Sequence, residues 1–208
     1  MQEPVQKSST SLLPQTPCAQ SVFTYPSRRR ARRSRVRPRA AECLRNRWHT
    51  GHVDGQLAIR RAAAADYDAI IGVVDGWWGR PVTTALPRLF LEHFAHTSLI
   101  AERDGVLAGF LIGFVSPDDP RAAYIHFAGI DPDHRGTGLA RDLYNRFIAA
   151  AKSDGREVIR AITSPNNVAS IAFHKALGFD VGGPIMDYNG PHKDMVTFEL
   201  HIPAWPQL

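Results

Sequence analysis

A strand, a glycine-rich turn and the start of a helix are predicted across Ile130–Ala140, where the residue types can bind a phosphate group. The segment reads IDPDHRGTGLA, and Pro132 stops strand pairing before the glycines open the turn. The first N–H groups of a helix lack intrahelical acceptors and carry partial positive charge. The turn lacks the Gly-Lys-Ser or Gly-Lys-Thr of a P-loop, and Arg141 occupies the place of the third glycine in G-x-G-x-x-G. A phosphate-containing ligand is predicted, and an ordinary glycine-rich turn is the alternative for this segment alone.

A second pattern follows about 27 residues later, where Asn167 and His174 precede Leu177-Gly178-Phe179. Together with the R-x-x-G-x-A arrangement of the turn, it resembles the motifs of the GNAT N-acetyltransferase superfamily over residues 57–202. The resemblance implies an α/β fold with flanking helices. Its mixed central sheet would splay open between the fourth and fifth strands, Ala122–Asp131 and Arg156–Thr163. It also implies that acetyl-CoA binds in the splay as cosubstrate, and no metal is expected.

The resemblance assigns the cofactor to the residues of both motifs. The pyrophosphate would lie on the backbone amides of residues 135–140, and the pantetheine chain would pair with backbone near Ile130, where an amide would also activate the thioester. Coenzyme A carries several negative charges, whereas residues 57–208 hold 14 basic and 17 acidic residues. The grip must therefore come from local amides and one arginine. The cofactor-binding candidates are Ile130, Arg135, Gly136, Thr137, Gly138, Leu139, Ala140, Asn167 and His174.

Two histidines are candidates for proton transfer. The family pattern frequently has tyrosine at position 174, thought to protonate the departing thiolate, whereas this chain has His174. A histidine pKa near about 6.5 lies below the thiol value near about 8.5, so His174 needs a raised pKa or a bridging water to act as the acid. Packing against the pantetheine is its alternative role. Strict alternation places His126 on one strand face with Tyr124 and Ile130, where it is either the general base or a hydrogen-bonded core histidine.

The acceptor side is predicted at two breaks in the chain, Gly76–Pro81 and Met186–His192. The paired tryptophans of the first break form either an aromatic wall or part of the core. Tyr188 in the second break is a further catalytic acid or base candidate, or else a loop tyrosine packed on the sheet. Asp75 and Asp187 could attract an amine, and both equally suit cap and turn roles.

Hydrophobic periodicity predicts the elements that would position these residues. Strands are predicted at Leu57–Arg61, Ser98–Glu102, Val106–Val115, Ala122–Asp131, Arg156–Thr163, Asp180–Gly182 and Met195–Ile202. Helices are predicted after an N-cap at Asp66, and at Thr84–His96, Gly136–Ser153 and Asn167–Leu177. Arg103-Asp104-Gly105 between two apolar runs indicates a hairpin.

Charge divides the chain into two parts. Residues 1–56 hold eleven basic and three acidic residues, including eight arginines at positions 28–39. We expect this segment to be disordered, because it cannot bury enough apolar surface to offset its ordering entropy. A nucleic-acid-binding arm, a transit peptide, a surface-adsorbing tail and a dispensable segment are the alternatives for it, and translation from near Val53 is one hypothesis. The N-acetyltransferase domain is predicted at residues 57–203, with no nucleic-acid partner.

Cysteine placement and hydropathy exclude several classes. Cys18 and Cys43 both lie in the first segment, so residues 57–208 have no thiol for an acetyl-cysteine intermediate, a zinc site or a disulfide. The longest apolar run, Val106–Val115, is about half of what a membrane-spanning helix needs. No secretory signal is recognisable near Leu12, because Pro14 interrupts the apolar residues. We expect a cytoplasmic protein without a membrane partner.

The predicted function is transfer of an acetyl group from acetyl-CoA to a primary amine by direct attack. The acceptor is expected to be a small molecule or a peptide. The sequence does not distinguish them, because the fold alone does not fix the substrate. A non-catalytic acyl-CoA-binding or regulatory module of the same fold is the alternative. A homodimer is left open.

Overall fold

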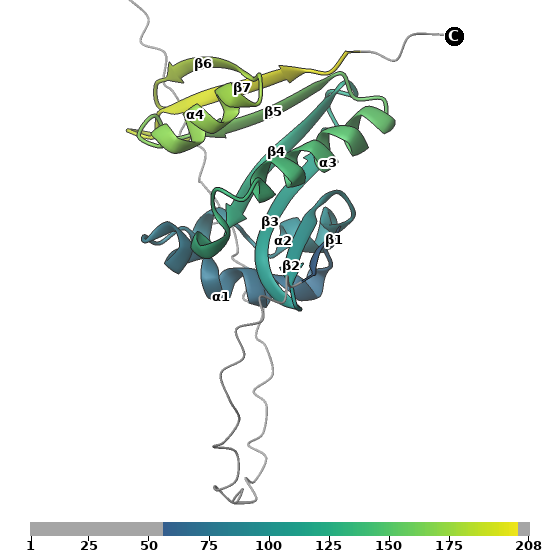
Figure 1. Ribbon diagram of the computed structural model, residues 1–208. Coiled ribbons are helices and arrows are strands. Elements are labelled where there is room, and N and C mark those ends of the chain that lie inside the picture. Colours follow the sequence, from purple (N-terminus) through teal and green to yellow (C-terminus); the bar gives the residue numbers. More distant parts are fainter. Residues whose placement is uncertain (1–55, 204–208) are drawn as a thin grey trace, which may run out of the picture. The chain divides into compact units, whose positions relative to one another are not determined.

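Seven strands form one sheet in the computed structural model, which describes residues 56–203. The strands are β1 (Leu57–Arg61), β2 (Leu99–Arg103), β3 (Val106–Val115), β4 (Ala122–Ile130), β5 (Val158–Thr163), β6 (Asp180–Ile185) and β7 (Met195–His201). Their order is β1-β2-β3-β4-β5-β7-β6, and only the β4–β5 pair is parallel (Figure 1). Each predicted strand is confirmed, with ends that differ by up to three residues.

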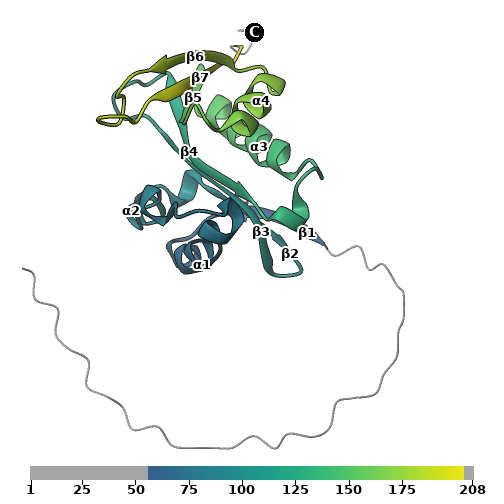
Figure 2. The same ribbon diagram turned by 90° about the vertical axis from the view of Figure 1, so that its left-hand side faces the viewer.

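Helices cover both faces of this sheet. They are α1 (Tyr67–Trp78), α2 (Leu89–His93), α3 (Leu139–Ser153) and α4 (Val168–Ala176), with short 3₁₀ turns η1 (Ala64–Asp66), η2 (Thr83–Ala85), η3 (Ala95–Thr97) and η4 (Pro132–His134). Figure 2 shows α1 and α2 on one side of β3 and β4, with α3 and α4 on the other. The predicted mixed α/β architecture is therefore confirmed.

The helix predicted at Thr84–His96 is wrong in its extent. The segment contains η2, the short α2 and η3 instead. Pro87 has no N–H to donate and disfavours the helical conformation in the residue before it. Leu86 accordingly adopts φ −125° and ψ 75°, and the helix begins only beyond the proline.

The predicted hairpin between β2 and β3 is confirmed. Asp104 and Gly105 both have positive φ, at 53° and 78°, as a two-residue type I′ turn requires. Asp66 precedes α1 as predicted, but its side chain does not cap that helix. Its carboxylate accepts hydrogen bonds from the Ala63 backbone N–H (2.7 Å) and from Arg60 instead.

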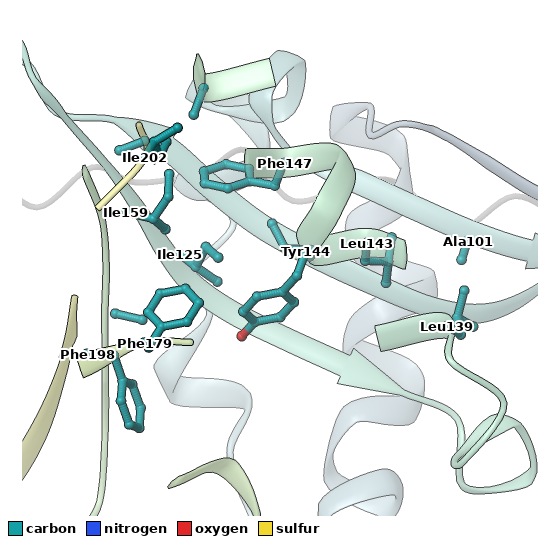
Figure 3. Close-up of a cluster of buried hydrophobic side chains, with 14 of the residues drawn as sticks. Ala101, Ile125, Leu139, Leu143, Tyr144, Phe147, Ile159, Phe179, Phe198 and Ile202 are labelled. Atoms are coloured by element: carbon teal, nitrogen blue, oxygen red, sulfur yellow. The ribbon is translucent and has the colours of Figure 1, made fainter. Parts of the chain in front are cut away.

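The two helical layers enclose separate hydrophobic clusters. The cluster beneath α3 includes Ile125, Leu143, Phe147, Ile159 and Phe198, each at most 3% exposed (Figure 3). The cluster beneath α1 includes Ile70, Val74, Leu91, Phe110 and Ile112, all fully buried. Burying each of these larger side chains contributes about 1.5–3 kcal/mol, so the clusters hold both layers of helices against the sheet.

The sheet splays open between β4 and β5, as predicted. The two strands pair only where Ala122–Ile125 of β4 lie opposite residues 158–161 of β5. Beyond Ile125, β4 pairs with β3 alone, while β5 continues beside β7 (Figure 1). One edge of β4 is therefore left without a strand partner over its last residues.

A β-bulge at His126 overturns the predicted alternation along β4. Gly113 of β3 lies opposite Ile125, but the preceding residue lies opposite Phe127, so His126 is the extra residue. Ile125 and Ile130 consequently pack into the cluster beneath α3, whereas Phe127 packs into the cluster beneath α1. The prediction that His126 shares a face with Ile130 was wrong, because the bulge shifts the side-chain period.

The predictions for the arginine-rich segment fall on residues 1–55 and lie outside the described residues. Within residues 56–203, no helix combines the length and the apolar character needed to cross a membrane.

Candidate active site

The glycine-rich turn connects the end of β4 to α3. Asp131 Oδ1 accepts a hydrogen bond from the Asp133 N–H (3.0 Å) and fixes η4, and Gly138 then adopts φ 92° immediately before α3. The first backbone hydrogen bond of α3 runs from the Asp142 N–H to the Gly138 carbonyl (3.1 Å). The N–H groups of residues 139–141 therefore have no acceptor within the helix. These N–H groups are free to bind an anion, which is the role that the sequence predicts for them.

Arg135 links this turn to α1. Its Nε donates to the Ile130 carbonyl (3.3 Å), and its Nη2 donates to the Trp77 carbonyl (2.6 Å). Two of the guanidinium N–H groups therefore hold the end of α1 against the end of β4. Sequence reasoning predicted its charge at the site but not this bridging role, which depends on α1 ending beside the turn.

The unpaired edge of β4 offers backbone groups to an extended ligand. The Asp131 N–H donates toward β3, to the Ala108 carbonyl (3.0 Å). Backbone direction alternates along a strand, so the N–H and C=O groups of Ile130 and Ala128 point to the opposite edge, toward the splay. This is the edge at which the sequence predicts pairing with a pantetheine chain.

Two adjoining cavities occupy the splay. The smaller, about 300 Å³, extends along the end of β4 to Ile130, Arg135 and Ala140. The larger, about 620 Å³, opens toward His126 and the segment that follows α1. The residues that line both cavities are Trp78, Ala128, Tyr144, Asn167, Ser170 and His174. These six residues, the cavity junction, mark where the two spaces meet.

The structure brings all nine predicted cofactor-binding residues to the smaller cavity or to the turn beside it. Ile130, Arg135, Ala140, Asn167 and His174 line the cavity. The remaining predicted residues, Gly136, Thr137, Gly138 and Leu139, lie in the turn and at the start of α3, where their backbone amides could serve a ligand. Thr137 also has an exposed hydroxyl, which donates to the His134 carbonyl (2.8 Å). The Leu139 side chain is buried in the core beneath α3.

His174 is a buried histidine with both ring nitrogens engaged. It is 4% exposed, and its ring stacks on Phe198 with 3.8 Å between the ring centroids. Nδ1 lies 2.8 Å from the Ser170 carbonyl, which can only accept, so Nδ1 carries the proton. Nε2 then accepts from the Tyr144 hydroxyl at 3.2 Å. Burial lowers the pKa of His174, although the Ser170 hydrogen bond opposes this, so a direct acid role is disfavoured.

His126 is half-buried at the wall of the larger cavity. Its Nε2–H donates to the Ala85 carbonyl (2.8 Å), and its ring stacks on Phe90 with 3.9 Å between centroids. Burial lowers the pKa of His126 more than this hydrogen bond raises it, so the ring is neutral near pH 7. The base role predicted for His126 therefore falls on Nδ1, the nitrogen that retains a lone pair.

Tyr188 and Tyr144 lie in contrasting positions. Tyr188 is 48% exposed in the turn after β6 and lines neither cavity, so its catalytic role stays a prediction. In the sequence Tyr144 belongs only to the apolar face of a helix, yet it lines both cavities, with its hydroxyl 3.2 Å from Nε2 of His174. No sequence signal could have identified it, because its approach to His174 depends on how α3 and α4 pack.

The segment after α1 separates the roles of its two tryptophans. Trp77 stacks on Phe110 with 6.0 Å between centroids and fills the core, whereas Trp78 packs on Phe127 and lines both cavities. Gly129 is required for this packing, because a Cβ there would lie 2.5 Å from Trp78 Cη2. Trp78 is thus the tryptophan placed where it could form the aromatic wall predicted for the acceptor side.

The two candidate acidic residues of the acceptor side have local structural roles. Asp75 Oδ1 accepts from the backbone N–H groups of Val82 (2.7 Å) and Thr83 (3.0 Å). Asp187 Oδ1 accepts from the His192 backbone N–H (2.6 Å). Both therefore fix loops, which was the alternative that their sequence positions left open.

The acetyltransferase (GNAT) family model matches residues 67–179, more than half of the chain, including β4, α3, β5 and α4. The chain belongs to the GNAT family. The resemblance read from the two motifs is thereby confirmed, together with the fold that it implied.

Several GNAT proteins of known identity resemble the chain in sequence. The L-2,4-diaminobutyric acid acetyltransferase of Nocardia farcinica is 30% identical over 89 residues, which cover 43% of this chain and 46% of that protein. The Escherichia coli L-amino acid N-acyltransferase MnaT is 36% identical over 85 residues, which cover 40% of this chain and 49% of that protein. The matches with these two relatives span about half of their length. The L-methionine sulfoximine/L-methionine sulfone acetyltransferase of Salmonella typhimurium is 36% identical over 138 residues, or 60% and 81%.

Solved GNAT structures share the fold. The acetyltransferase yncA of Salmonella typhimurium, solved with acetyl-CoA, superposes with a TM-score of 0.56 at 26% identity, covering 73% of this chain and 98% of that one. A GNAT acetyltransferase from Desulfovibrio desulfuricans gives a TM-score of 0.62 at 18% identity, covering 70% and 99%.

Proposed function

We propose that the chain is an N-acetyltransferase that moves an acetyl group from acetyl-CoA to the primary amine of a small acceptor. The observation that carries this proposal is the pair of adjoining cavities in the splay. The smaller cavity follows the unpaired edge of β4 toward the free amides of α3, and the larger cavity opens beside His126. A long thioester and an amine can therefore meet at the cavity junction.

The chain's own groups suit acetyl-CoA as the acyl donor. The amides at the start of α3 would bind the pyrophosphate, supported by the remaining donors of Arg135. The β4 edge at Ala128 and Ile130 would pair with the amides of the pantetheine chain, and an N–H at this edge would polarise the thioester carbonyl. Residues 56–203 contain no cysteine, so the acceptor amine attacks the thioester directly.

His126 is proposed as the base for the acceptor. An ammonium group must lose a proton before its nitrogen can attack, and the neutral His126 ring can accept that proton at Nδ1, directly or through a water. Its stacking on Phe90 and its bond to the Ala85 carbonyl hold the ring in one orientation. Orientation of this kind makes proton transfer more efficient.

The acceptor is proposed to carry a carboxylate as well as an amine. Arg80 and Lys193 line the larger cavity from opposite loops, and no Asp or Glu is found among its described lining residues. Neither cation forms an ion pair with another described residue. An amino acid or an amino-acid analogue complements this charge, and the relatives named above act on molecules of that chemistry.

An acceptor panel tests this proposal. The protein is mixed with acetyl-CoA and one acceptor at a time, and the release of free CoA thiol is measured. The acceptors are amino acids, amino-acid carboxamides and amines without a carboxylate. Amino acids are expected to be the better acceptors, and Arg80→Gln or Lys193→Gln to raise the amino-acid KM about fivefold, the equivalent of losing one exposed ion pair. Lys175→Gln, an exposed cation outside both cavities, is the matched control. Equal turnover of amino acids and their carboxamides would contradict the carboxylate preference.

A non-catalytic acyl-CoA-binding module is the second candidate. The buried, neutral His174 in place of the family's usual tyrosine favours it, because this side chain cannot readily protonate a thiolate. Saturable acetyl-CoA binding without thiol release on any amine would support this candidate. From the sequence, we also propose that the protein is cytoplasmic and that a peptide is the alternative acceptor. A homodimer and the absence of a nucleic-acid partner stay predictions.

A further inference from the structure

The cavity junction contains a buried phenol that the proposed reaction has not used. Among the six junction residues, Asn167 has both ends of its amide engaged, with the Ser170 N–H (3.2 Å) and Thr163 Oγ1 (3.1 Å). His174 donates its single ring proton from Nδ1 to the Ser170 carbonyl. Two junction residues have hydroxyl groups. Ser170 Oγ lies 3.3 Å from His174 Nδ1, which carries the ring proton, whereas the Tyr144 hydroxyl donates to the unprotonated Nε2.

The Tyr144 hydroxyl is placed by α3 and held by α4. Its ring packs edge-on against Phe173, His174 and Phe179, with centroid separations of 5.0, 5.4 and 6.4 Å. Figure 3 shows the ring projecting from α3 with its hydroxyl on the side of Phe179 and Phe198. Tyr144 is 5% exposed, yet it borders both cavities. The hydroxyl therefore lies where a thioester extending from the smaller cavity would meet the acceptor.

The tautomer of His174 determines what the hydroxyl can do. Nε2 is an acceptor, so in the resting protein the Tyr144 hydroxyl donates its hydrogen bond to Nε2, with 3.2 Å between the heavy atoms. This bond is long for an O–H donor. Rotation about the phenolic C–O bond would turn the proton away from Nε2 toward a charge that develops in the junction. Burial raises the pKa of Tyr144, so the phenol remains protonated and available as a donor.

We propose that Tyr144 donates a hydrogen bond to the sulfur of CoA as it departs, with His174 as the residue that positions it. This role rests on the proposed acetyl transfer. The amine nitrogen forms a bond to the acetyl carbon, the carbon–sulfur bond breaks, and its electron pair stays on sulfur. The proton lost by the amine passes to His126 or water, and the thiolate is neutralised from solvent. Tyr144 stabilises the developing negative charge and keeps its own proton, so no tyrosinate is formed.

The assignment explains how a GNAT domain can operate with histidine at position 174. A neutral histidine whose Nδ1–H is committed to a carbonyl has no proton to offer the sulfur. The hydroxyl that this function needs is contributed by the neighbouring helix α3 instead. Its placement requires α3, α4 and the splay together, which is why no local motif reports it.

The decisive variant is Tyr144→Phe, which keeps the packed ring and removes the hydroxyl. We expect kcat with acetyl-CoA to fall about 10²-fold, the loss typical of a missing donor at a developing charge. The KM for acetyl-CoA should change little, because the donor acts on the departing sulfur. Tyr124→Phe is the matched control. Tyr124 is a half-buried tyrosine that packs on Phe114 and lines neither cavity, whereas Tyr144 is buried.

A selenium analogue of the donor separates a chemical role from a structural one. The acetyl selenoester of CoA has nearly the same shape, but its leaving selenolate is much less basic and needs less stabilisation. The Tyr144→Phe defect should shrink to below about tenfold with this donor, because less charge needs stabilising. An equal loss with both donors, or an unchanged kcat with acetyl-CoA, overturns the assignment of Tyr144.

Two further measurements keep the outcome interpretable. If Tyr144→Phe does not fold, fluorotyrosine at position 144 keeps the ring and hydroxyl while making the phenol a stronger donor. The kcat with acetyl-CoA should then differ from that of the unmodified chain, and an identical kcat counts against the role. Absence of turnover by the wild-type chain on every amine overturns the proposed function and this inference together. If the wild type turns over but the Tyr144→Phe loss in kcat is the same with acetyl-CoA and with its selenoester, the inference alone is overturned.

Discussion

At the scale of single residues, carbonyl acceptors fix the protonation of both histidines in the splay. The Ala85 carbonyl holds a proton on Nε2 of His126, and the Ser170 carbonyl holds one on Nδ1 of His174. The lone pairs are therefore left on opposite ring nitrogens in the two residues. His126 presents a base, whereas His174 presents an acceptor to Tyr144. The sequence identified both histidines as candidates but not their tautomers. The partner of His126 comes from another element, whereas the partner of His174 lies four residues earlier in α4.

His126 should control the acid limb of the pH profile. Burial lowers its pKa, so the neutral ring persists below about pH 6.5, and kcat/KM should decline only at lower pH. His126→Gln should lower kcat about 10²-fold or more and remove that limb. His201→Gln, at the exposed end of β7, is the control. An acid limb that survives in His126→Gln would show that another group accepts the proton.

At the scale of elements, α3 approaches β3 over a glycine. A Cβ at Gly113 would lie 2.4 Å from Cε2 of the buried Phe147, so Gly113→Ala should lower the free energy of unfolding by about 1–3 kcal/mol through overpacking. Gly72 is an exposed position within α1, where an added Cβ would meet no other atom within 4 Å. Gly72→Ala should raise the free energy of unfolding by about 0.5–1 kcal/mol. Urea denaturation of both variants tests the pair, and equal effects would contradict the close approach of α3.

Elements were predictable where their cause is local. Apolar periodicity and the Asp104-Gly105 turn are written into neighbouring residues, so the strands and the β2–β3 hairpin agree with the structure. The bulge at His126 is a property of the pairing between β3 and β4, and no local pattern marks it. Pro87 did provide a local signal against one long helix, but the apolar spacing around it outweighed that signal in the prediction.

At the scale of the whole domain, the buried histidines should link folding to pH. The folded pKa values of His126 and His174 lie below the unfolded value near 6.5. The unfolded chain therefore binds more protons in this range, and stability should fall as the pH drops from about 7 through 6.5 and below. Melting temperatures between pH 5 and 8 measure this loss. It should be smaller in His174→Phe, which keeps an aromatic ring against Phe198, and an unchanged slope would contradict the neutral buried state of His174.

A carboxylate separates a second pH window from the first. Arg60 holds the pKa of Asp66 below its usual value of 3.8 through a hydrogen-bonded ion pair. This pair stabilises the fold above that value and is lost as the pH falls through the lower folded pKa. Losses of stability above about pH 5 therefore report the histidines and not Asp66.

The central claim concerns the splay as a place where a thioester and an amine react. The most direct measurement mixes the full chain with acetyl-CoA and an amino acid, and follows the N-acetylated product by mass spectrometry and the free CoA thiol by colour development. The account predicts that product and thiol appear in equal amounts and that neither forms without the protein. Saturable acetyl-CoA binding with no acetylated product from any amino acid or other amine would contradict it.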